Sequence, residues 1–559
     1  MKAAVAPWLR GYRRSWLRGD VVAGLTVWAV LVPESLAYAT IAGVDPVVGL
    51  YAAPAALVLY ALFGSSRHLV VGPMSATAAL SAAVVGPVAA GGGNFTALTA
   101  ALAVVTGAVA VLAGLLRFGF LAGFISEPVL KGFIIGLALT ILAGQLPKLL
   151  GAPKSEGDFF ARIWGLITQL GHANGWAAAV GIAALALVLA LRHWLPLIPA
   201  SLVAVAAGVA ASILLDLQRH GVALVGHITG GLPPLGPPPV AAPDYSTLVG
   251  GAVGVALVGF AEGLGAAKTY AARAGYDIDP NRELAGLGAA NLGAGLCAGM
   301  PVNGSLSKTA VNGGAGARSQ VSGLTAAALT VLTLLFLTAL FERLPEPVLA
   351  AIVIAAVVDL IDFPALARLY RVWTRRLGRI YGPAARADFL AALAALAGVL
   401  IFDTLPGLFL GIGISLLLLL YRASRPNIAE LGRLPGGAWV DLRRHPDADT
   451  VPGIAVVRIE GGLFFANAER VRSALRAYGR RDGVHAVVLD AETVPFVDVT
   501  AAEMLLGLNR ELARNHAILI LAHDIGQVRD VLVKESGDEY VYRTVDEAVT
   551  AAKGTGAGT

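Results

Sequence analysis

Cysteine and charged residues are both scarce in this chain of 559 residues. It has one cysteine, Cys297, and only 14% charged residues. A single thiol excludes an internal disulfide framework and a metal site built from several cysteines. Soluble domains average about 25% charged residues, whereas here 57% are hydrophobic and the mean hydropathy is +0.72. These totals predict a polytopic membrane protein. They do not indicate nucleic-acid binding, because the basic residues lie in loops between apolar runs.

The patterns that would indicate an enzyme or a cleaved leader are also missing. No Walker-type or dinucleotide-binding pattern occurs, no metal-ligand spacing is visible, and the nine histidines are scattered, mostly in loops. The N-terminus lacks the short apolar core and small-residue cleavage site of a secretory signal. We therefore predict a protein that is not an enzyme and has no cofactor and no metal.

Apolar runs fill most of residues 1–425. A membrane span needs about 20 mostly apolar residues. Two sets of seven runs approach this length. They are residues 20–40, 47–63, 73–89, 95–116, 122–147, 176–192 and 197–215, then 247–268, 283–298, 304–313, 319–340, 346–367, 386–402 and 406–423. Residues 1–425 are thus expected to form an all-α membrane domain.

Charge in the loops predicts the topology of these spans. Several basic residues precede the first span, which favours a cytoplasmic N-terminus. Loops after even-numbered spans are basic, and the loop after the twelfth carries Arg368, Arg371, Arg375, Arg376, Arg379 and Arg386. The exceptions on the opposite side are Lys148, Lys154, Arg162, Arg219 and Arg343. We expect an even number of spans in the plasma membrane, with both termini cytoplasmic.

The character of the sequence changes near Pro426. Short apolar runs at Ile454–Ile459, Ala486–Leu489 and Ile518–Ala522 predict strands. They alternate with three predicted helices, Ala468–Tyr478, Ala501–Arg514 and Gln527–Lys534. Alternating strands and helices predict a small cytoplasmic α/β domain over residues 426–552. The Gly/Thr-rich residues 553–559 are expected to be a disordered tail.

A polar break lies deep in the apolar series, from Met300 to Asn312. Pro301 and Gly304 stop the preceding segment, and Ser305 can cap a new helix. A helix that starts inside the membrane presents free N–H groups that attract anions, and Lys308 adds a full positive charge one turn later. The break is therefore interpreted as half of an anion site. A polar re-entrant loop with only a structural role is the alternative, as is a snorkelling Lys308.

The first half of the chain holds a matching break at residues 71–77. Gly72 and Pro73 precede Ser75, which could cap a second helix starting at depth. Corresponding interrupted segments in two halves indicate a transporter binding site. The candidate hydroxyl donors are Tyr38, Thr77, Ser307 and Thr309. Each of these could equally serve helix packing.

Two acids occupy corresponding positions inside spans. Glu34 precedes Ser75 by 41 residues, and Glu262 precedes Ser305 by 43. Carboxylates at bilayer depth form ion pairs, become protonated or line a transport pathway. An acid beside an anion site repels the anion when ionised and tolerates it when protonated. We therefore predict Glu34 as the proton-coupling group and Glu262 as a gating or second coupling group. Either could instead pair with Lys308 or Lys268 and merely hold helices together.

These stretches resemble one known family. Residues 33–39, Pro-Glu-Ser-Leu-Ala-Tyr-Ala, look like the first-span motif of the sulfate permease family, usually Pro-Gln-Ser-Met-Ala-Tyr-Ala. Gly72-Pro73 fits the opening of its third span. Residues 303–312 are similar to its Gly-Ser-Phe-Ser-Arg-Ser/Thr-Ala-Val-Asn motif. The C-terminal domain resembles a STAS domain (sulfate transporter and anti-sigma factor antagonist). The family includes bacterial relatives of the animal anion exchangers.

The resemblance implies a fold of fourteen spans in two inverted seven-helix repeats, with spans 1–4 and 8–11 as a core and the rest as a gate. It further implies elevator-like alternating access in a homodimer. Substrate is expected between the starts of spans 3 and 10. The residues expected at the substrate site are Tyr38, Ser75, Ala76, Thr77, Gly304, Ser305, Leu306, Ser307 and Lys308.

Two departures from the family pattern bear on substrate and coupling. Glu34 replaces a frequent Gln, which favours proton coupling as in dicarboxylate-transporting relatives. Lys308 replaces a frequent Arg, so it keeps the charge and loses the bidentate fork for oxyanions. A sodium-coupled bicarbonate relative carries an Asp in the eighth span, so Glu262 leaves sodium coupling open without favouring it.

The predicted function is proton-coupled secondary transport of a small anion, with sulfate as first choice and a dicarboxylate as second. Sodium-coupled bicarbonate transport, anion exchange and uncoupled conduction stay open. A nucleobase transporter shares the architecture but lacks the STAS domain. A membrane-anchored STAS sensor or scaffold is the alternative from another class. Thr500 and Glu503 have capping-box spacing, so Thr500 is expected to start a helix, with phosphorylation there as a regulatory alternative.

Overall fold

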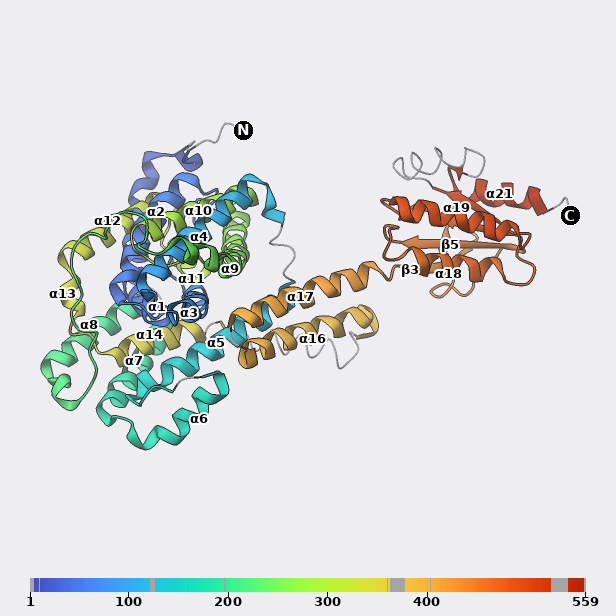
Figure 1. Ribbon diagram of the computed structural model, residues 1–559. Helices are drawn as coiled ribbons and strands as arrows, with labels where there is room; N and C mark the ends of the chain where they lie inside the picture. Colours follow the sequence, from blue (N-terminus) through green and yellow to red (C-terminus); the bar gives the residue numbers. More distant parts are fainter. Residues whose placement is uncertain are drawn as a thin grey trace. The chain divides into compact units, whose positions relative to one another are not determined.

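The computed structural model describes residues 5–9, 11–120, 126–155, 157–195, 198–358, 360–361, 378–402, 404–523 and 541–556 (Figure 1). Arg368, Arg371, Arg375 and Arg376, the predicted helix Gln527–Lys534 and residues 557–559 lie outside these ranges. The chain divides into two compact units, Met1–Ser415 and Leu416–Thr559.

Eight helices of the first unit pack together as a core domain. They are α1 (Leu17–Ala42), α2 (Pro46–Phe63), α3 (Ser75–Ala89) and α4 (Phe95–Leu115), with α9 (Ala242–Ala274), α10 (Pro280–Leu296), α11 (Leu306–Gly314) and α12 (Val321–Phe336). Helix α10 packs against α2 and α4, while α12 packs against α1 and α2. This is the grouping that the family resemblance implies for spans 1–4 and 8–11.

The remaining long helices form the gate domain, and the last of them extends past Ser415, where the first unit ends. They are α5 (Glu127–Leu150), α7 (Gly175–Trp194), α8 (Ala200–Leu214), α14 (Glu346–Val358), α16 (Gly378–Phe402) and α17 (Thr404–Ala423). Helix α5 packs against α7, α14 and α16. Two short segments precede α1, namely η1 (Pro7–Leu9) and η2 (Arg14–Trp16). Others lie between long helices, namely α6 (Phe159–Gln169), η4 (Leu170–His172), η5 (Leu217–His220) and α13 (Thr338–Phe341).

Every predicted span overlaps one of these helices. Within the described chain, seven helices are long and apolar enough to cross a membrane, and others are shorter apolar helices. The structure adds α6, which the sequence analysis missed because only Leu166 of this helix is buried and no continuous apolar run marks it.

Helix packing follows an internal symmetry between the two halves. Suppose that the first-half helices α1, α2, α4, α5 and α7 correspond, in this order, to the second-half helices α9, α10, α12, α14 and α16. The contact of α1 with α12 then maps onto the contact of α9 with α4. The contact of α4 with α10 likewise maps onto that of α12 with α2, and α5 with α16 maps onto α14 with α7. The contacts of α2 with α10 and α5 with α14 map onto themselves. This pattern is what two repeats related by a pseudo-two-fold axis produce.

Two short strands join the halves at the polar breaks. Strand β1 (Val70–Gly72) pairs antiparallel with β2 (Asn303–Ser305), with Val71 opposite Gly304. Backbone hydrogen bonds between the strands satisfy groups that lipid could not. Helices α3 and α11 therefore begin side by side, directly after the two strands.

The second unit contains a six-stranded sheet with the order β4-β3-β5-β6-β7-β8. Its strands are β3 (Asn427–Arg433), β4 (Trp439–Asp441), β5 (Ile454–Glu460), β6 (Ala486–Asp490), β7 (Ile518–Ala522) and β8 (Val541–Tyr542). Strands β5 to β8 run parallel, and β3 is antiparallel to β4 and β5. The three predicted strands are confirmed, whereas β3, β4 and β8 were not predicted.

Helices α18 (Ala468–Gly479) and α19 (Val499–Ala513) share one apolar cluster with the sheet, whereas α21 (Val545–Gly556) contributes to another. Residues of β5 and β6 alternate between the two clusters, as expected for a sheet covered on both faces. The prediction of a disordered tail was wrong for residues 553–556, because α21 continues through them. This helix could have been predicted from the helical spacing of its apolar residues Val545, Ala548, Val549 and Ala552, whose side chains are buried on the sheet.

Candidate functional site

Helix α11 begins with the predicted cap. Ser305 has extended backbone angles, and its Oγ accepts a hydrogen bond from the Lys308 N–H at 3.2 Å. The Ser305 and Ser307 hydroxyls lie 3.1 Å apart. Ser307 and Leu306 are exposed, although they follow a fully buried strand. The first turn of α11 thus has an exposed serine at the positive end of the helix dipole, which is an arrangement suited to an anion.

Helix α3 begins without a side-chain cap, which corrects the prediction for Ser75. The residue before the helix is Met74, and Ser75 is already the first helical residue. Ser75, Ala76 and Thr77 are all buried, and the Thr77 hydroxyl donates to the Met74 carbonyl at 3.2 Å. The prediction placed the cap at Ser75 by analogy with Ser305, but here the chain enters the helix one residue earlier. The N–H groups of this first turn lack a side-chain acceptor.

Lys308 is buried and engaged on three sides. Its side chain is 1% exposed, so it does not snorkel. The Nζ atom lies 3.2 Å from Glu34 Oε2 of α1, donates to the Pro73 carbonyl at 2.8 Å, and lies 5.1 Å from the centre of the Tyr38 ring. The Lys308 ammonium therefore links α11 to α1 and to Pro73, which lies just before α3.

The contact between Lys308 and Glu34 is the ion pair that the sequence analysis raised as an alternative. The Glu34 Oε2 atom has no hydrogen-bond donor in good geometry among the described residues. The ammonium of Lys308 is therefore what compensates the charge of that oxygen. Removing one member of a buried pair leaves an uncompensated charge and typically costs about 3–5 kcal/mol.

Glu262 has a different partner from its counterpart in the first half. Its Oε2 accepts a hydrogen bond from the Asn303 side chain at 3.2 Å, and Asn303 Oδ1 accepts from the Gly304 N–H at 2.7 Å. The alternative that Glu262 pairs with Lys308 or Lys268 is not what the structure shows. Gly304 has to be small, because a Cβ there would lie 3.0 Å from the Cα of Gly263 in α9. A strand with a side chain at this position could not approach Glu262 so closely.

Besides Thr309, which was predicted as a hydroxyl donor and bonds to backbone atoms, several residues that position this site were not predicted. The Thr309 hydroxyl donates to the Ser305 carbonyl and accepts from the Val70 N–H at 3.1 Å, and the Asn312 amide donates to the His68 carbonyl at 2.9 Å. Asn303 connects Glu262 to β2. Because Asn303 directly precedes Gly304 in the polar break, its place in the site could have been predicted from the sequence. The roles of Val70 and His68 could not be found, because they act through backbone atoms.

In the second unit, Thr500 is not the helix cap, which corrects another prediction. Asp498 precedes α19, and its Oδ1 accepts from the Ala501 N–H at 2.8 Å. A carboxylate is a stronger hydrogen-bond acceptor than a threonine hydroxyl. Thr500 is instead exposed in the first turn of α19.

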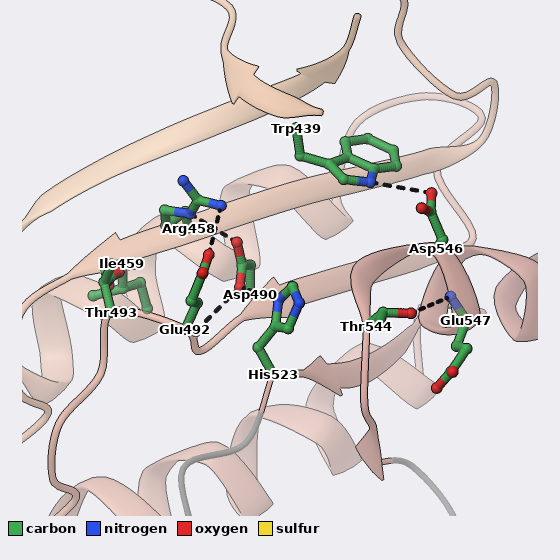
Figure 2. A network of polar contacts seen from close by, with 10 residues as sticks. All are labelled: Trp439, Arg458, Ile459, Asp490, Glu492, Thr493, His523, Thr544, Asp546 and Glu547. Carbon is green, nitrogen blue, oxygen red and sulfur yellow. Dashed lines mark hydrogen bonds and ion pairs between the residues drawn. The ribbon is translucent and has the colours of Figure 1, made fainter. Parts of the chain in front are cut away.

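A charged cluster lies at the carboxyl ends of β5, β6 and β7 in the same unit (Figure 2). Asp490 is fully buried, accepts from Arg458 Nε at 2.7 Å through Oδ2, and contacts His523 Nδ1 at 3.0 Å through Oδ1. Arg458 also contacts Glu492 at 3.2 Å. Asp490, Glu492 and His523 are close enough to surround one ion. However, the Arg458 guanidinium already compensates both carboxylates.

Comparison with known proteins identifies the family. The model of the sulfate permease family matches residues 17–377, and the STAS domain model matches residues 445–548. The chain belongs to the sulfate permease family. Two relatives are a probable sulfate transporter from Mycobacterium tuberculosis, 38% identical over 97% of this chain and 96% of the relative, and probable sulfate transporter 4.2 from Arabidopsis thaliana, 32% identical over 97% and 82%.

Solved structures of this family's fold agree with the architecture. The structure of SLC26A9 superposes with a TM-score of 0.89 and 22% identity, covering 99% of this chain and 93% of that one. The transmembrane domain of the cyanobacterial bicarbonate transporter BicA superposes with a TM-score of 0.61 and 23% identity, covering 72% and 99%. This sulfate permease family member therefore has the predicted fold, and it transports anions across a membrane. The matched families and relatives are transporters, not enzymes.

Proposed function

We propose that this chain carries sulfate across the plasma membrane together with a proton, and that the anion binds between the starts of α3 and α11. The observation that supports the site is the pair of adjacent helix starts with Lys308 between them. The first turn of α11 exposes Ser307, and neither Ser75 nor another side chain caps α3. Tyr38, Ala76, Thr77, Gly304, Ser305 and Leu306 complete the proposed substrate site.

The ion pair of Glu34 and Lys308 supports proton coupling. While Glu34 is ionised, the charges of the two side chains cancel, and the site offers an anion only helix dipoles and hydroxyl groups. Protonation of Glu34 removes the negative charge and leaves the ammonium 2.8 Å from the Pro73 carbonyl at the head of α3. Buried charges act strongly in low dielectric, so the site gains most of its attraction for an anion in that state.

Coupling of this kind is reciprocal. If protonation of Glu34 strengthens anion binding, a bound anion favours protonation by the same free energy. The occupied site then carries both ions, and an elevator movement of the core domain past the gate domain would carry them together. Glu262 lies beside the same strand through Asn303, and we assign it a gating or secondary coupling role.

Sulfate is the first choice of substrate because two relatives are described as probable sulfate transporters. A dicarboxylate is the second choice, because Lys308 lacks the fork geometry with which arginine grips an oxyanion. BicA is described as a bicarbonate transporter, so sodium-coupled bicarbonate transport or anion exchange is the alternative function.

The test is uptake of labelled sulfate into proteoliposomes, with and without an inward proton gradient. Unlabelled succinate, fumarate and bicarbonate are added as competitors, and an inward sodium gradient replaces the proton gradient in a parallel series. We expect the proton gradient to accelerate uptake in the unaltered chain. In Glu34→Gln, we expect the acceleration to disappear while sulfate exchange persists in part. Unchanged gradient dependence in that variant would remove Glu34 as the coupling residue.

Three further assignments complete the proposal. The functional unit is a homodimer, and both termini are cytoplasmic. Thr500 is a possible phosphorylation site, because a phosphate in the first turn of a helix is favoured by the exposed N–H groups. Mass spectrometry of the protein from cells under varied sulfate supply tests for phosphate on Thr500, and absence of phosphate in every condition contradicts this assignment.

If no anion moved through the purified protein, a STAS sensor or scaffold would become the leading function.

A further inference from the structure

A cavity lies between the core and gate domains, and none of its lining residues belongs to the first turn of α3 or of α11. Its volume is about 430 Å³. The core side is formed by the end of α1, the second and third turns of α3 and the start of α4. The gate side is formed by the end of α5, α6 and the start of α17. Since α1 ends and α17 begins here, the cavity lies at one membrane face.

Three cations line this cavity, and they are residues that break the charge bias of the loops. Lys148 is at the end of α5, Lys154 follows it, and Arg162 is in α6. In the topology predicted from charge, loops on this face otherwise carry few basic residues. None of the described residues that line the cavity is an acid. Glu346 attracts Lys148 electrostatically, but it does not line the cavity.

The cavity also contains polar atoms without protein partners. The Gln145 side chain is 5% exposed, and its Oε1 has no hydrogen-bond partner among the described residues. The hydroxyl of Ser155, a half-buried residue, also has no hydrogen-bond partner among the described residues. Buried polar groups normally have partners, so such atoms call for a ligand or water. A hydroxyl and an amide that can turn to present its NH₂ group are both donors that suit an anion.

We propose that this cavity is a second anion site, where the transported anion binds at the membrane face opposite the termini before it reaches the starts of α3 and α11. Lys148, Lys154 and Arg162 attract the anion, and Gln145 and Ser155 donate hydrogen bonds to it. The inference rests on the proposed function, because it names a further binding place for the same substrate. A cavity lined by charges of one sign raises the local concentration of its counter-ion and the rate of capture.

The test compares the two membrane faces. Labelled sulfate uptake is measured in right-side-out and inside-out membrane vesicles for the unaltered chain and for Lys154→Gln combined with Arg162→Gln. We expect the variant to raise KM about tenfold in right-side-out vesicles, with kcat retained, and to leave KM unchanged in inside-out vesicles. High salt should reduce the difference. Equal KM values for variant and unaltered chain on both faces would overturn the proposal.

The matched control is Arg219→Gln, which removes one cation from the same face outside the cavity. Arg219 is exposed and pairs with Asp216 at 2.7 Å. We expect its KM to be unchanged. Lys154→Gln alone is a second variant that should fold normally because Lys154 is exposed. It should raise the right-side-out KM by a smaller factor.

Direct binding separates failure of this inference from failure of the proposed function. Purified protein is titrated with labelled sulfate, and we expect two sulfate ions per chain, one in the variant with both cations removed. If the unaltered chain transports no sulfate, the proposed function fails, and this stoichiometry still decides the cavity. An unchanged stoichiometry overturns the second site. Loss of a bound phospholipid from the variant, seen by mass spectrometry with both KM values unchanged, would also overturn it.

Discussion

The starts of α3 and α11 are held together by β1 and β2, yet only α11 has a side-chain cap. Ser305 accepts from the Lys308 N–H, whereas Met74 offers no acceptor to α3. The acids of the two halves differ in the same way. Glu34 contacts an ammonium, and Glu262 contacts the amide of Asn303.

This difference shows that a repeated scaffold can carry unequal chemistry. The backbone of both halves provides a helix start at membrane depth, as the symmetric helix contacts do for the surrounding bundle. The charge that distinguishes the halves comes from Lys308 alone, since α3 has no cation in its first turn. Four predictions test how far the halves differ, from the largest expected effect to the smallest.

The largest effect is expected for Lys308→Gln. It leaves Glu34 buried beside no cation, which should cost about 3–5 kcal/mol of stability. Transport should fall by at least about 100-fold, because the site loses the Lys308 ammonium, and a loss of about 3 kcal/mol in anion-binding free energy corresponds to two powers of ten in affinity. Thermal melting and sulfate flux measure the two effects. In the double variant that also carries Glu34→Gln, the melting temperature should recover while sulfate flux stays low. Lys268→Gln, at an exposed position of α9, is the control. Normal flux in Lys308→Gln would contradict an electrostatic role.

The two acids should differ in their effect on proton coupling. In Glu34→Gln the gradient dependence of uptake should vanish. In Glu262→Gln it should persist with a lower rate, because Glu262 contacts a neutral amide and not the ammonium. Initial uptake rates at several external pH values distinguish the variants. If only Glu262→Gln lost gradient dependence, the assignments of the two acids would have to be exchanged.

The two glycines of β1 and β2 should differ in their tolerance of a methyl group. At Gly304 a Cβ would lie 2.8 Å from Leu69 Cδ2 and 3.0 Å from the backbone of Gly263. Gly304→Ala should therefore cost about 1–3 kcal/mol, as overpacking does. At Gly72 the neighbour within 4 Å is Leu31 Cδ1, 3.0 Å away, a side-chain end that can move. Gly72→Ala should melt closer to the unaltered protein, and the reverse order would contradict this packing.

The smallest effect concerns the serines. Ser305→Ala should destabilise the protein by about 1 kcal/mol, the usual value of a lost N-cap. Ser75→Ala should cost less, since no backbone N–H loses a side-chain acceptor. Melting temperatures of the two variants provide the comparison. Equal losses would mean that Ser75 acts as a cap after all.

Most of the fold could be predicted because it depends on local sequence. Apolar runs of membrane-spanning length fix where helices form, since lipid cannot satisfy backbone groups outside helices or closed sheets. Pro73, Gly304 and Ser305 marked the breaks because proline and glycine stop helices and serine starts them. Helix α6 was missed because it has no continuous apolar run. Strands β1 and β2 were missed because three residues pairing across more than 200 positions leave no local pattern.

The sequence predicted which residues belong to the candidate site, but not which of them contact one another. Glu34, Tyr38 and Lys308 were all named, but pairing of Glu34 with Lys308 was only one of two alternatives. Which lysine approaches an acid depends on how α1 and α11 cross, and spacing along the chain does not determine that. Thr500 was assigned a cap that Asp498 provides, since both residues are competent caps and only backbone geometry selects one.

The sequence by itself determined the class of the protein: a membrane bundle in two related halves, two polar breaks at depth, and an α/β domain after residue 425. Composition and periodicity are local quantities, and the bilayer converts them directly into helices. Only the tertiary structure decided which groups meet. It joined Lys308 to Glu34 and Pro73, gave Asn303 to Glu262, and gathered Lys148, Lys154 and Arg162 around one cavity. These contacts join distant segments, so they depend on packing that no single stretch of sequence contains.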